Sequence, residues 1–220
     1  MKYIKTYEQI NNVNSLDLIK AAKNNDIDEV KKLINAGANV DLQDKYGYTA
    51  LIWASYLSYI EIVKELIKAG ADLDLQNNYG STALICASRY SYIEIVKELI
   101  KAGANLDIQT IGGNTALILA SSNDNLEIVK ELINGGANID LQDKYGNTAL
   151  INTVDNTVDY GNIDLVKELI KAGADWNLKN NHNRDFFNYL KPEDKKQIIE
   201  EFPQEYKLYI IKKDAEKYNL

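Results

Sequence analysis

Apolar residues along this chain recur in two short patterns that alternate through most of its length. The first is an Ala-Leu-Ile run that follows a threonine, and the second is a stripe such as Ile62, Val63, Leu66 and Ile67. The stripe has the spacing i, i+1, i+4 and i+5, which places apolar side chains on one face of a helix and does not fit the alternation of a strand. The polarity pattern therefore predicts pairs of short helices.

Both patterns repeat with a period of 33 residues. The threonines that begin the first pattern are Thr49, Thr82, Thr115 and Thr148, and the glycines that follow the second are Gly37, Gly70, Gly103 and Gly136. Self-similarity at such a period is typical of repeat proteins, in which each unit buries its apolar side only against its neighbours. The period predicts an all-α array of helix pairs.

The ends of these helices carry recognisable signals. Thr49 is placed to cap the first helix of its unit, which we expect to begin at Ala50. Ser58-x-x-Glu61 and Ser91-x-x-Glu94 fit a capping box at the start of the second helix. Gly70 follows the last residue of the stripe and suits the left-handed position just after a helix.

One unit, beginning at Asp44, reads DKYGYTALIWASYLSYIEIVKELIKAGADLDLQ. It resembles the ankyrin repeat, whose pattern runs roughly D-x-x-G-x-T-P-L-H-x-A, then two linking residues and Gly-His, then x-E-I-V-x-x-L-L-x-x-G-A-x-x-N. The resemblance covers about residues 15 to 190 and implies an all-α ankyrin-repeat solenoid of helix-turn-helix units with projecting hairpin loops. The family's proline and histidine are replaced by Ala and Ile in all four units; Ala suits a helix start, and a buried Ile contributes apolar burial in place of a polar network.

The expected domain organisation is one continuous array followed by a terminal cap. The array spans residues 1–179, with repeats near 15–43, 44–76, 77–109, 110–142 and 143–179. Residues 180–220 form a degenerate C-terminal capping repeat and tail helix, in which Asp185 takes the threonine position. The tail is expected to cap the core through Ile198, Ile199 and Phe202. An atypical terminal repeat keeps the end of a solenoid soluble.

Composition narrows the classes of partner. The formal net charge is −7, and an acidic chain is a poor candidate for binding nucleic acid or an anionic membrane. We therefore expect a protein partner, with a basic or mixed surface. There is one cysteine and no apolar run long enough to span a membrane or to form a signal peptide, so we expect a cytoplasmic protein.

The sequence contains few candidate catalytic or ligand-binding residues. Cys86 and His182 are the one cysteine and the one histidine, and neither has a candidate base at a motif spacing. Cys86 falls at a variable first-helix position together with Trp53, Leu119 and Asn152, and His182 falls in a polar turn. The Gly112-Gly113 pair lacks the remaining residues of a phosphate loop, and no loop has the ligand positions of a calcium site. We expect no catalytic residues, no metal site and no cofactor, and hence no enzyme.

The resemblance implies that contacts come from hairpin tips, the exposed side of the first helix and the turn between helices. Eight of the fifteen tyrosines occupy such positions, and tyrosine is enriched at binding hot spots. The predicted partner-binding residues are Tyr46, Tyr48, Trp53, Tyr56, Tyr59, Tyr79, Arg89, Tyr90 and Tyr92. For Tyr46, Tyr79 and Tyr145 a repeat-consensus role, with packing on the neighbouring loop, is favoured over contact with a partner.

The sequence thus predicts a monomeric, non-catalytic protein–protein interaction module with a rigid tyrosine-rich surface. One alternative is an adaptor whose C-terminal helices recruit a second partner such as ubiquitin-ligase machinery, because Leu190, Pro192, Glu193, Ile198 and Ile199 faintly resemble the start of an F-box-type motif. An enzyme and a scaffold that self-associates through its aromatic residues are more distant alternatives. A four-residue insertion in the segment TVDNTVDYGN lengthens one inter-helix turn, either for binding or through neutral drift.

Overall fold

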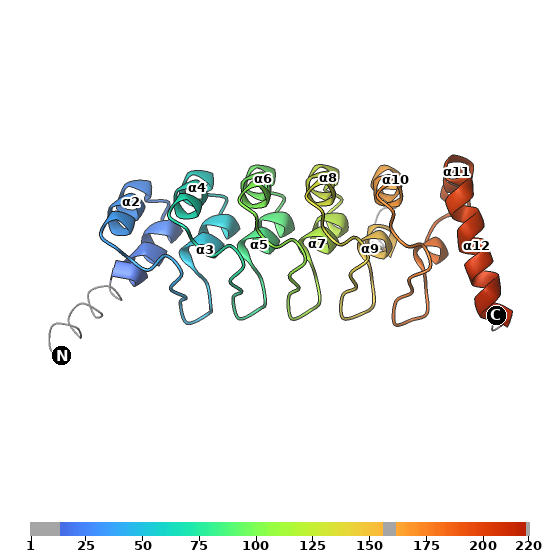
Figure 1. The fold of residues 1–220 in the computed structure, drawn as a ribbon, viewed down its shortest axis with the longest axis horizontal. Coiled ribbons are helices and arrows are strands. Elements are labelled where there is room, and N and C mark those ends of the chain that lie inside the picture. Colours follow the sequence, from blue (N-terminus) through green and yellow to red (C-terminus); the bar gives the residue numbers. More distant parts are fainter. Residues whose placement is uncertain (1–13, 156–161, 219–220) are drawn as a thin grey trace. The chain divides into compact units, whose positions relative to one another are not determined.

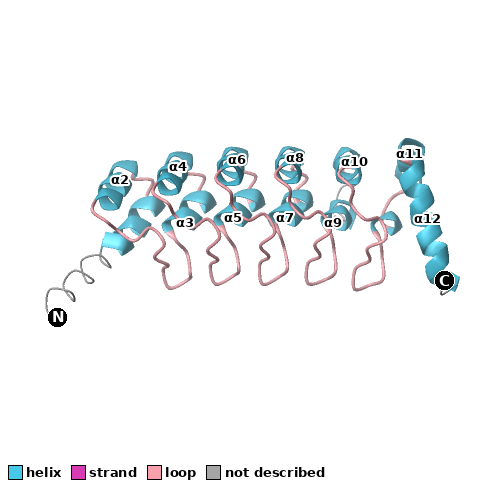
Figure 2. Ribbon diagram, viewed as in Figure 1, coloured by secondary structure: helices cyan, strands magenta, loops and turns pink. Residues whose placement is uncertain are grey.

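The computed structural model describes residues 14–155 and 162–218, which form helices and loops with no strand among them (Figure 2). These residues divide into two compact units, with the boundary between Ile111 and Gly112. Most of the insertion predicted in the segment TVDNTVDYGN lies in residues 156–161, outside the described residues.

The first unit contains a helix over residues 14–23 and then five helices of seven or nine residues. They are α2 (Ile27–Asn35), α3 (Ala50–Tyr56), α4 (Ile60–Lys68), α5 (Ala83–Arg89) and α6 (Ile93–Lys101). Helix α3 packs against α4 and α5, α5 packs against α6, and α4 packs against both α2 and α6. Figure 1 shows α2, α4 and α6 in one row, with the long loops projecting on the side away from it.

The second unit continues the same pattern and ends in a different one. Its helices are α7 (Ala116–Ser122), α8 (Leu126–Asn134), α9 (Ala149–Asp155), α10 (Ile163–Lys171), the short 3-10 helix η1 (Phe186–Asn188), α11 (Pro192–Glu201) and α12 (Pro203–Tyr218). Helix α9 packs against α7, α10 and η1, and α11 packs against α12. The expected all-α fold of helix pairs is confirmed.

The first helices begin where the threonines predict. Thr49 Oγ1 accepts a hydrogen bond from the Ile52 amide over 3.1 Å, and the same bond forms at Thr82, Thr115 and Thr148. The Ala-Leu-Ile runs that follow are buried, as are the stripe residues Ile62, Val63 and Leu66 of α4. Burial of these faces against the neighbouring helix pair supplies the apolar stabilisation that a seven-residue helix lacks by itself.

The capping boxes predicted at the second helices are wrong. Helices α4 and α6 begin after Tyr59 and Tyr92, and neither of these N-cap residues caps the helix with its side chain. Ser58 and Ser91 lie one residue earlier, with φ of +66° and +63°. The turn between the helices needs a left-handed residue here, so the serine cannot take the extended N-cap conformation that a capping box requires.

The long loops form tight turns that hydrogen-bond to the next loop. In the first of them the Asp44 amide donates to the Tyr48 carbonyl over 2.9 Å, and Asp44 Oδ1 accepts from the amides of Tyr46 and Tyr48. The Asn78 amide of the next loop donates to the Tyr46 carbonyl over 3.0 Å. Gln43 Nε2 donates both to the Gly47 carbonyl at 2.8 Å and to the Gln76 carbonyl, one repeat later, at 2.9 Å.

The C-terminal cap contains two helices, α11 and α12, where the sequence predicts one tail helix. Ile198 and Phe202 are buried as expected, and Ile199 is partly exposed. The cap has two helices, and its core is an aromatic cluster of Trp176, Phe186, Phe187, Tyr206 and Tyr209.

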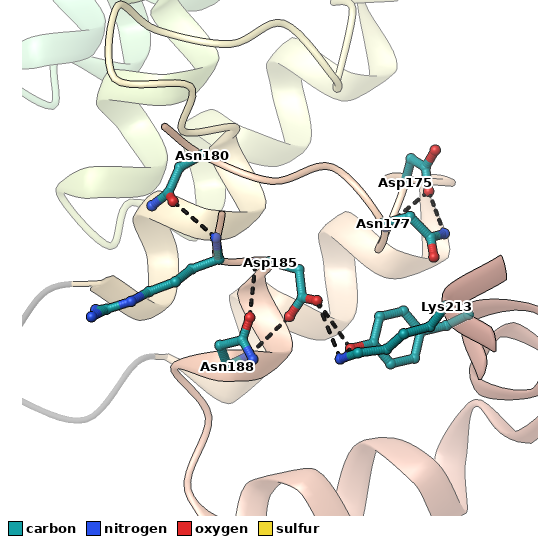
Figure 3. Close-up of polar contacts among 8 residues, drawn as sticks. Asp175, Asn177, Asn180, Asp185, Asn188 and Lys213 are labelled. Atoms are coloured by element: carbon teal, nitrogen blue, oxygen red, sulfur yellow. Dashed lines mark hydrogen bonds and ion pairs between the residues drawn. The ribbon is translucent and has the colours of Figure 1, made fainter. Parts of the chain in front are cut away.

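A buried polar contact fastens α12 to the degenerate repeat (Figure 3). Asp185 caps η1 by accepting from the Asn188 amide over 3.0 Å, as its position in the repeat predicts. Its second oxygen accepts from the Tyr209 hydroxyl over 3.0 Å and lies 3.6 Å from Lys213 Nζ. The degenerate repeat therefore holds the cap through the same residue that starts its own helix.

Candidate functional site

Five aromatic side chains from two successive repeats lie in one continuous row in the first unit. Tyr48 stacks on Trp53 with 4.4 Å between ring centroids, and Trp53 meets Tyr56 edge to face at 5.8 Å. Tyr56 then meets Tyr90 edge to face at 4.9 Å, and Tyr90 stacks on Tyr92 at 6.1 Å. These are the geometries that aromatic pairs prefer, so the rings fix one another's orientation. We call these five residues the aromatic row.

Trp53 is held from two sides. Its indole Nε1–H donates to Asp44 Oδ2 over 3.0 Å, and Lys23 Nζ lies 4.3 Å from the centroid of its ring. Since Asp44 Oδ1 already accepts two loop amides, one carboxylate orders both the loop and the indole. Trp53 remains partly exposed in this position. A large ring fixed at the surface loses little conformational entropy when it contacts a partner.

A pocket of about 270 Å³ lies beside the aromatic row. Its lining residues are Tyr48, Tyr56, Asn77, Tyr79, Ser81, Cys86, Arg89 and Tyr90. Cys86 is 4% exposed, whereas Tyr79, Arg89 and Tyr90 are exposed. The pocket thus combines a buried thiol, tyrosine rings, two short polar side chains and one cation.

Three groups that line the pocket, Tyr48, Cys86 and Tyr90, have raised pKa values. Burial raises the pKa of the Cys86 thiol to about 12, against a smaller opposing effect of the Arg89 guanidinium. A hydrogen bond with Tyr56, together with burial, raises the pKa of Tyr90 to about 12. Burial also raises the pKa of Tyr48. The hydroxyls of Tyr48 and Tyr90 and the thiol of Cys86 are therefore protonated near pH 7, and Arg89 adds a cation to the lining.

The structure brings together seven of the nine residues predicted to bind a partner. Five form the aromatic row, and Tyr79 and Arg89 line the adjoining pocket. Tyr59 is the N-cap residue of α4, and neither it nor Tyr46 belongs to the row or the pocket lining. Of the variable first-helix positions named above, Cys86 and Leu119 are buried and so are not displayed to a partner as Trp53 is.

The loop tyrosines use their backbone and leave their rings exposed. The carbonyls of Tyr46, Tyr79 and Tyr145 each accept an amide of the following loop. Their side chains are nevertheless 50%, 63% and 56% exposed. Lys45 Nζ and Lys144 Nζ lie 4.8 Å from the ring centroids of Tyr46 and Tyr145. These residues therefore contact the neighbouring loop through their backbone, whereas their rings are largely exposed.

Sequence reasoning missed the part that Asp44 plays. The acid appears only as the first letter of the repeat pattern, and its contact with Trp53 joins residues nine positions apart. Asn77 makes the same two loop bonds in the next repeat, but residue 86 there is Cys and offers no indole. The sequence did offer one indication of this contact, because the repeat that has Asp at position 44 is also the one that has Trp at position 53.

The described residues contain no group of three or more His, Cys, Asp or Glu arranged to hold a metal ion. Among those residues, no helix has both the length and the apolar character needed to cross a membrane. His182 is exposed in its loop turn, as expected for a polar turn residue.

Comparison with protein families gives one match. The model described as ankyrin repeats (3 copies) matches residues 18–110 and 102–180, and so spans most of the chain. A comparison with curated proteins gives no significant match.

Proposed function

The chain belongs to the ankyrin repeat family, whose repeats form protein–protein interaction modules, and we propose that it is a non-catalytic module that binds a protein partner through the aromatic row and the adjoining pocket. Within this proposal it acts as a monomer in the cytoplasm. Its single, buried cysteine is compatible with a reducing compartment.

The observation that carries the proposal is the continuity of the aromatic row across two repeats. Tyr48, Trp53 and Tyr56 come from one repeat and Tyr90 and Tyr92 from the next, and each ring contacts the one after it. Stability alone does not require such a row, because the core of each repeat is already filled by the Ala-Leu-Ile runs and the second-helix stripes. Large contiguous aromatic surfaces of this kind mark binding sites.

The pocket adds a place for an anchoring side chain. Interface hot spots are side chains that fill a pocket and exclude water, with a ring of less critical contacts around them. The pocket of about 270 Å³ is large enough for one leucine- or phenylalanine-sized side chain. Because Asp44 and the neighbouring rings hold the walls in place, binding need not order them.

The test is affinity capture with wild-type bait and with a Trp53→Ala/Tyr56→Ala/Tyr90→Ala bait, followed by mass spectrometry of proteins from the source cell or its host. The matched control is Ile111→Ala/Tyr145→Ala, which removes exposed apolar side chains outside the site. A partner retained by wild type and control but lost by the triple variant supports the proposal. Equal capture by all three baits contradicts it. Circular dichroism establishes that each bait is folded.

A second candidate function is an adaptor that recruits another protein through its C-terminal helices. The observation that favours it is the exposure of Leu208 and Ile211 on α12, at 62% and 54%. The residues of the F-box-like resemblance give it less support, because Leu190 and Ile198 are buried in the cap. A Leu208→Ser/Ile211→Ser variant that folds but loses a partner retained by the triple variant would establish this second site.

A further inference from the structure

The surroundings of the aromatic row differ in charge from the chain as a whole. The chain carries a formal net charge of −7. Yet Lys23 Nζ lies over the ring of Trp53, Arg89 lines the pocket, and Lys45 Nζ lies over the ring of Tyr46 in the adjoining loop. Three cations thus surround the part of the surface that carries the rings.

Asp44 is a carboxylate that contacts the aromatic row, and both of its oxygens already accept hydrogen bonds. Asp44 accepts two amides with Oδ1 and the Trp53 indole with Oδ2. The glutamates of the same repeats lie on the second helices, where Glu61 and Glu94 pair with Lys64 and Lys97 of their own helices. Figure 1 shows α4 and α6 in a row separate from α3 and α5, which carry Trp53, Tyr56 and Arg89. The glutamates of these repeats therefore lie on helices other than α3 and α5.

The side chains that line the pocket also include hydrogen-bond donors and a cation. The protonated hydroxyls of Tyr48 and Tyr90 can donate hydrogen bonds, and the Cys86 thiol is uncharged. Arg89 supplies a cation with several N–H donors at the edge. An apolar side chain suits the interior, and a carboxylate beside it would meet Arg89 and the hydroxyls. A lysine or arginine side chain in the same place would meet the guanidinium.

From these contacts we infer that the occupant of this surface is an acidic peptide segment, in which an aromatic or aliphatic anchor enters the pocket and flanking Asp or Glu side chains contact Arg89, Lys23 and Lys45. The inference rests on the proposed function and specifies the chemistry of its partner. It departs from the basic or mixed partner that the net charge predicts, because the charge near the contact, rather than the total, determines complementarity at short range.

The experiment is selection from a random peptide library displayed on phage, with the full chain immobilised and the triple variant used to discard peptides that bind elsewhere. The expected result is enrichment of sequences that hold one Phe, Trp, Tyr or Leu among several Asp and Glu. A selected peptide, synthesised with a fluorophore, is then titrated against wild type, Arg89→Gln and Lys101→Gln. Lys101 is an exposed lysine at the end of α6, so its variant removes the same charge outside the site.

Arg89→Gln should weaken the selected peptide about tenfold, as expected for loss of a charge-assisted hydrogen bond, and Lys101→Gln should leave its affinity within about twofold. The wild-type affinity should fall with added salt, and the Arg89→Gln variant should depend less on salt. A peptide with Asn and Gln in place of its acids should bind weakly to both proteins.

Two results separate failure of this inference from failure of the proposed function. Selection of basic peptides that do not bind the triple variant and are insensitive to Arg89→Gln would overturn the acidic partner and keep the binding surface. Absence of any peptide that distinguishes wild type from a folded triple variant would overturn both.

Discussion

Trp53 and Asp44 are joined by a 3.0 Å hydrogen bond from the indole Nε1–H to a carboxylate oxygen, and the other oxygen of that carboxylate closes the loop turn. Asp44 therefore fixes both the conformation of the loop and the orientation of the Trp53 ring. In the next repeat Asn77 closes an equivalent turn with its amide oxygen. Substitutions of Asp44 can therefore separate its contribution to the loop turn from its contribution to the position of the Trp53 indole.

Asp44→Asn should retain the turn, as Asn77 does, and lose the acceptor for the Trp53 indole. The expected loss of unfolding free energy is about 1.5–3 kcal/mol, the range for a hydrogen bond to a charged group. Asp44→Ala should cost more, because two loop amides also lose their acceptor. Urea unfolding gives both values, and tryptophan fluorescence reports the freed indole. Equal destabilisation by Asn and Ala would show that the indole bond contributes nothing separable.

Gly47→Ala should be more destabilising than Gly70→Ala. Both glycines have positive φ, +77° and +82°, so both substitutions cost about 1–2 kcal/mol in backbone strain. A Cβ at Gly47 would in addition lie 2.8 Å from the Asn78 amide nitrogen, whereas a Cβ at Gly70 meets nothing within 4 Å. Thermal unfolding of the two variants measures the difference. Equal melting temperatures would mean that the loops can separate at no cost.

Tyr209→Phe should loosen α12 without affecting the first unit. The variant removes a hydroxyl that donates to Asp185 and accepts from Lys213, over 3.0 Å and 2.6 Å. Because Asp185 is only 2% exposed, its carboxylate then loses one of its few partners, at an expected cost of about 1–3 kcal/mol. Amide hydrogen exchange should become faster in α12 and stay unchanged in α4 and α6.

Asp185→Thr completes a double-mutant cycle with Tyr209→Phe. Threonine caps the first helix at Thr148, so Asp185→Thr should retain the cap of η1 and lose the contact with Tyr209. The two substitutions should be non-additive by about 0.5–3 kcal/mol, as is usual for residues in contact. Additive effects would show that Asp185 stabilises the repeat only as a helix cap.

Cys86 should make the protein less stable as the pH rises above about 8.5, the ordinary pKa of a thiol. The folded pKa is about 12, so the unfolded chain loses its proton first and alkaline pH favours unfolding. Between these two values the thiol contributes a slope of about −1.4 kcal/mol per pH unit to the free energy of unfolding. Cys86→Ala should flatten the profile by this amount relative to wild type. An unchanged slope would mean that the folded thiol ionises as readily as the unfolded one.

Much of the fold follows from single positions of the repeat. The threonines predict where α3, α5, α7 and α9 begin, because a helix cap depends only on the adjacent amides. Ser58 shows where local reasoning fails. Its spacing to Glu61 fits a capping box, but the turn from α3 to α4 requires positive φ, a demand of the packing between helices. Other repeats have Asn25 and Asp124 at this place, residue types that tolerate this conformation better.

The aromatic row could be predicted only as a set of positions. Trp53, Tyr56 and Tyr90 were identifiable because the repeat assigns them to the first helix and the following turn. Their mutual contacts depend on the stacking of α3 on α5, which no spacing along the chain reports. The cap cluster around Trp176 was missed for the same reason, since Tyr209 reaches it from 33 residues away.

The glutamine side chains of the loops constrain how this protein can change in length. Gln43 and Gln76 each donate one N–H to their own loop and one to a carbonyl 33 residues later. Gln142 reaches Lys179, at 37 residues, because the four extra residues lie between the two positions. An insertion in an inter-helix turn leaves such contacts intact, whereas one between a glutamine and its own glycine breaks them. Evolution of this chain is therefore expected to proceed by duplicating or losing whole repeats and by lengthening the turns between paired helices.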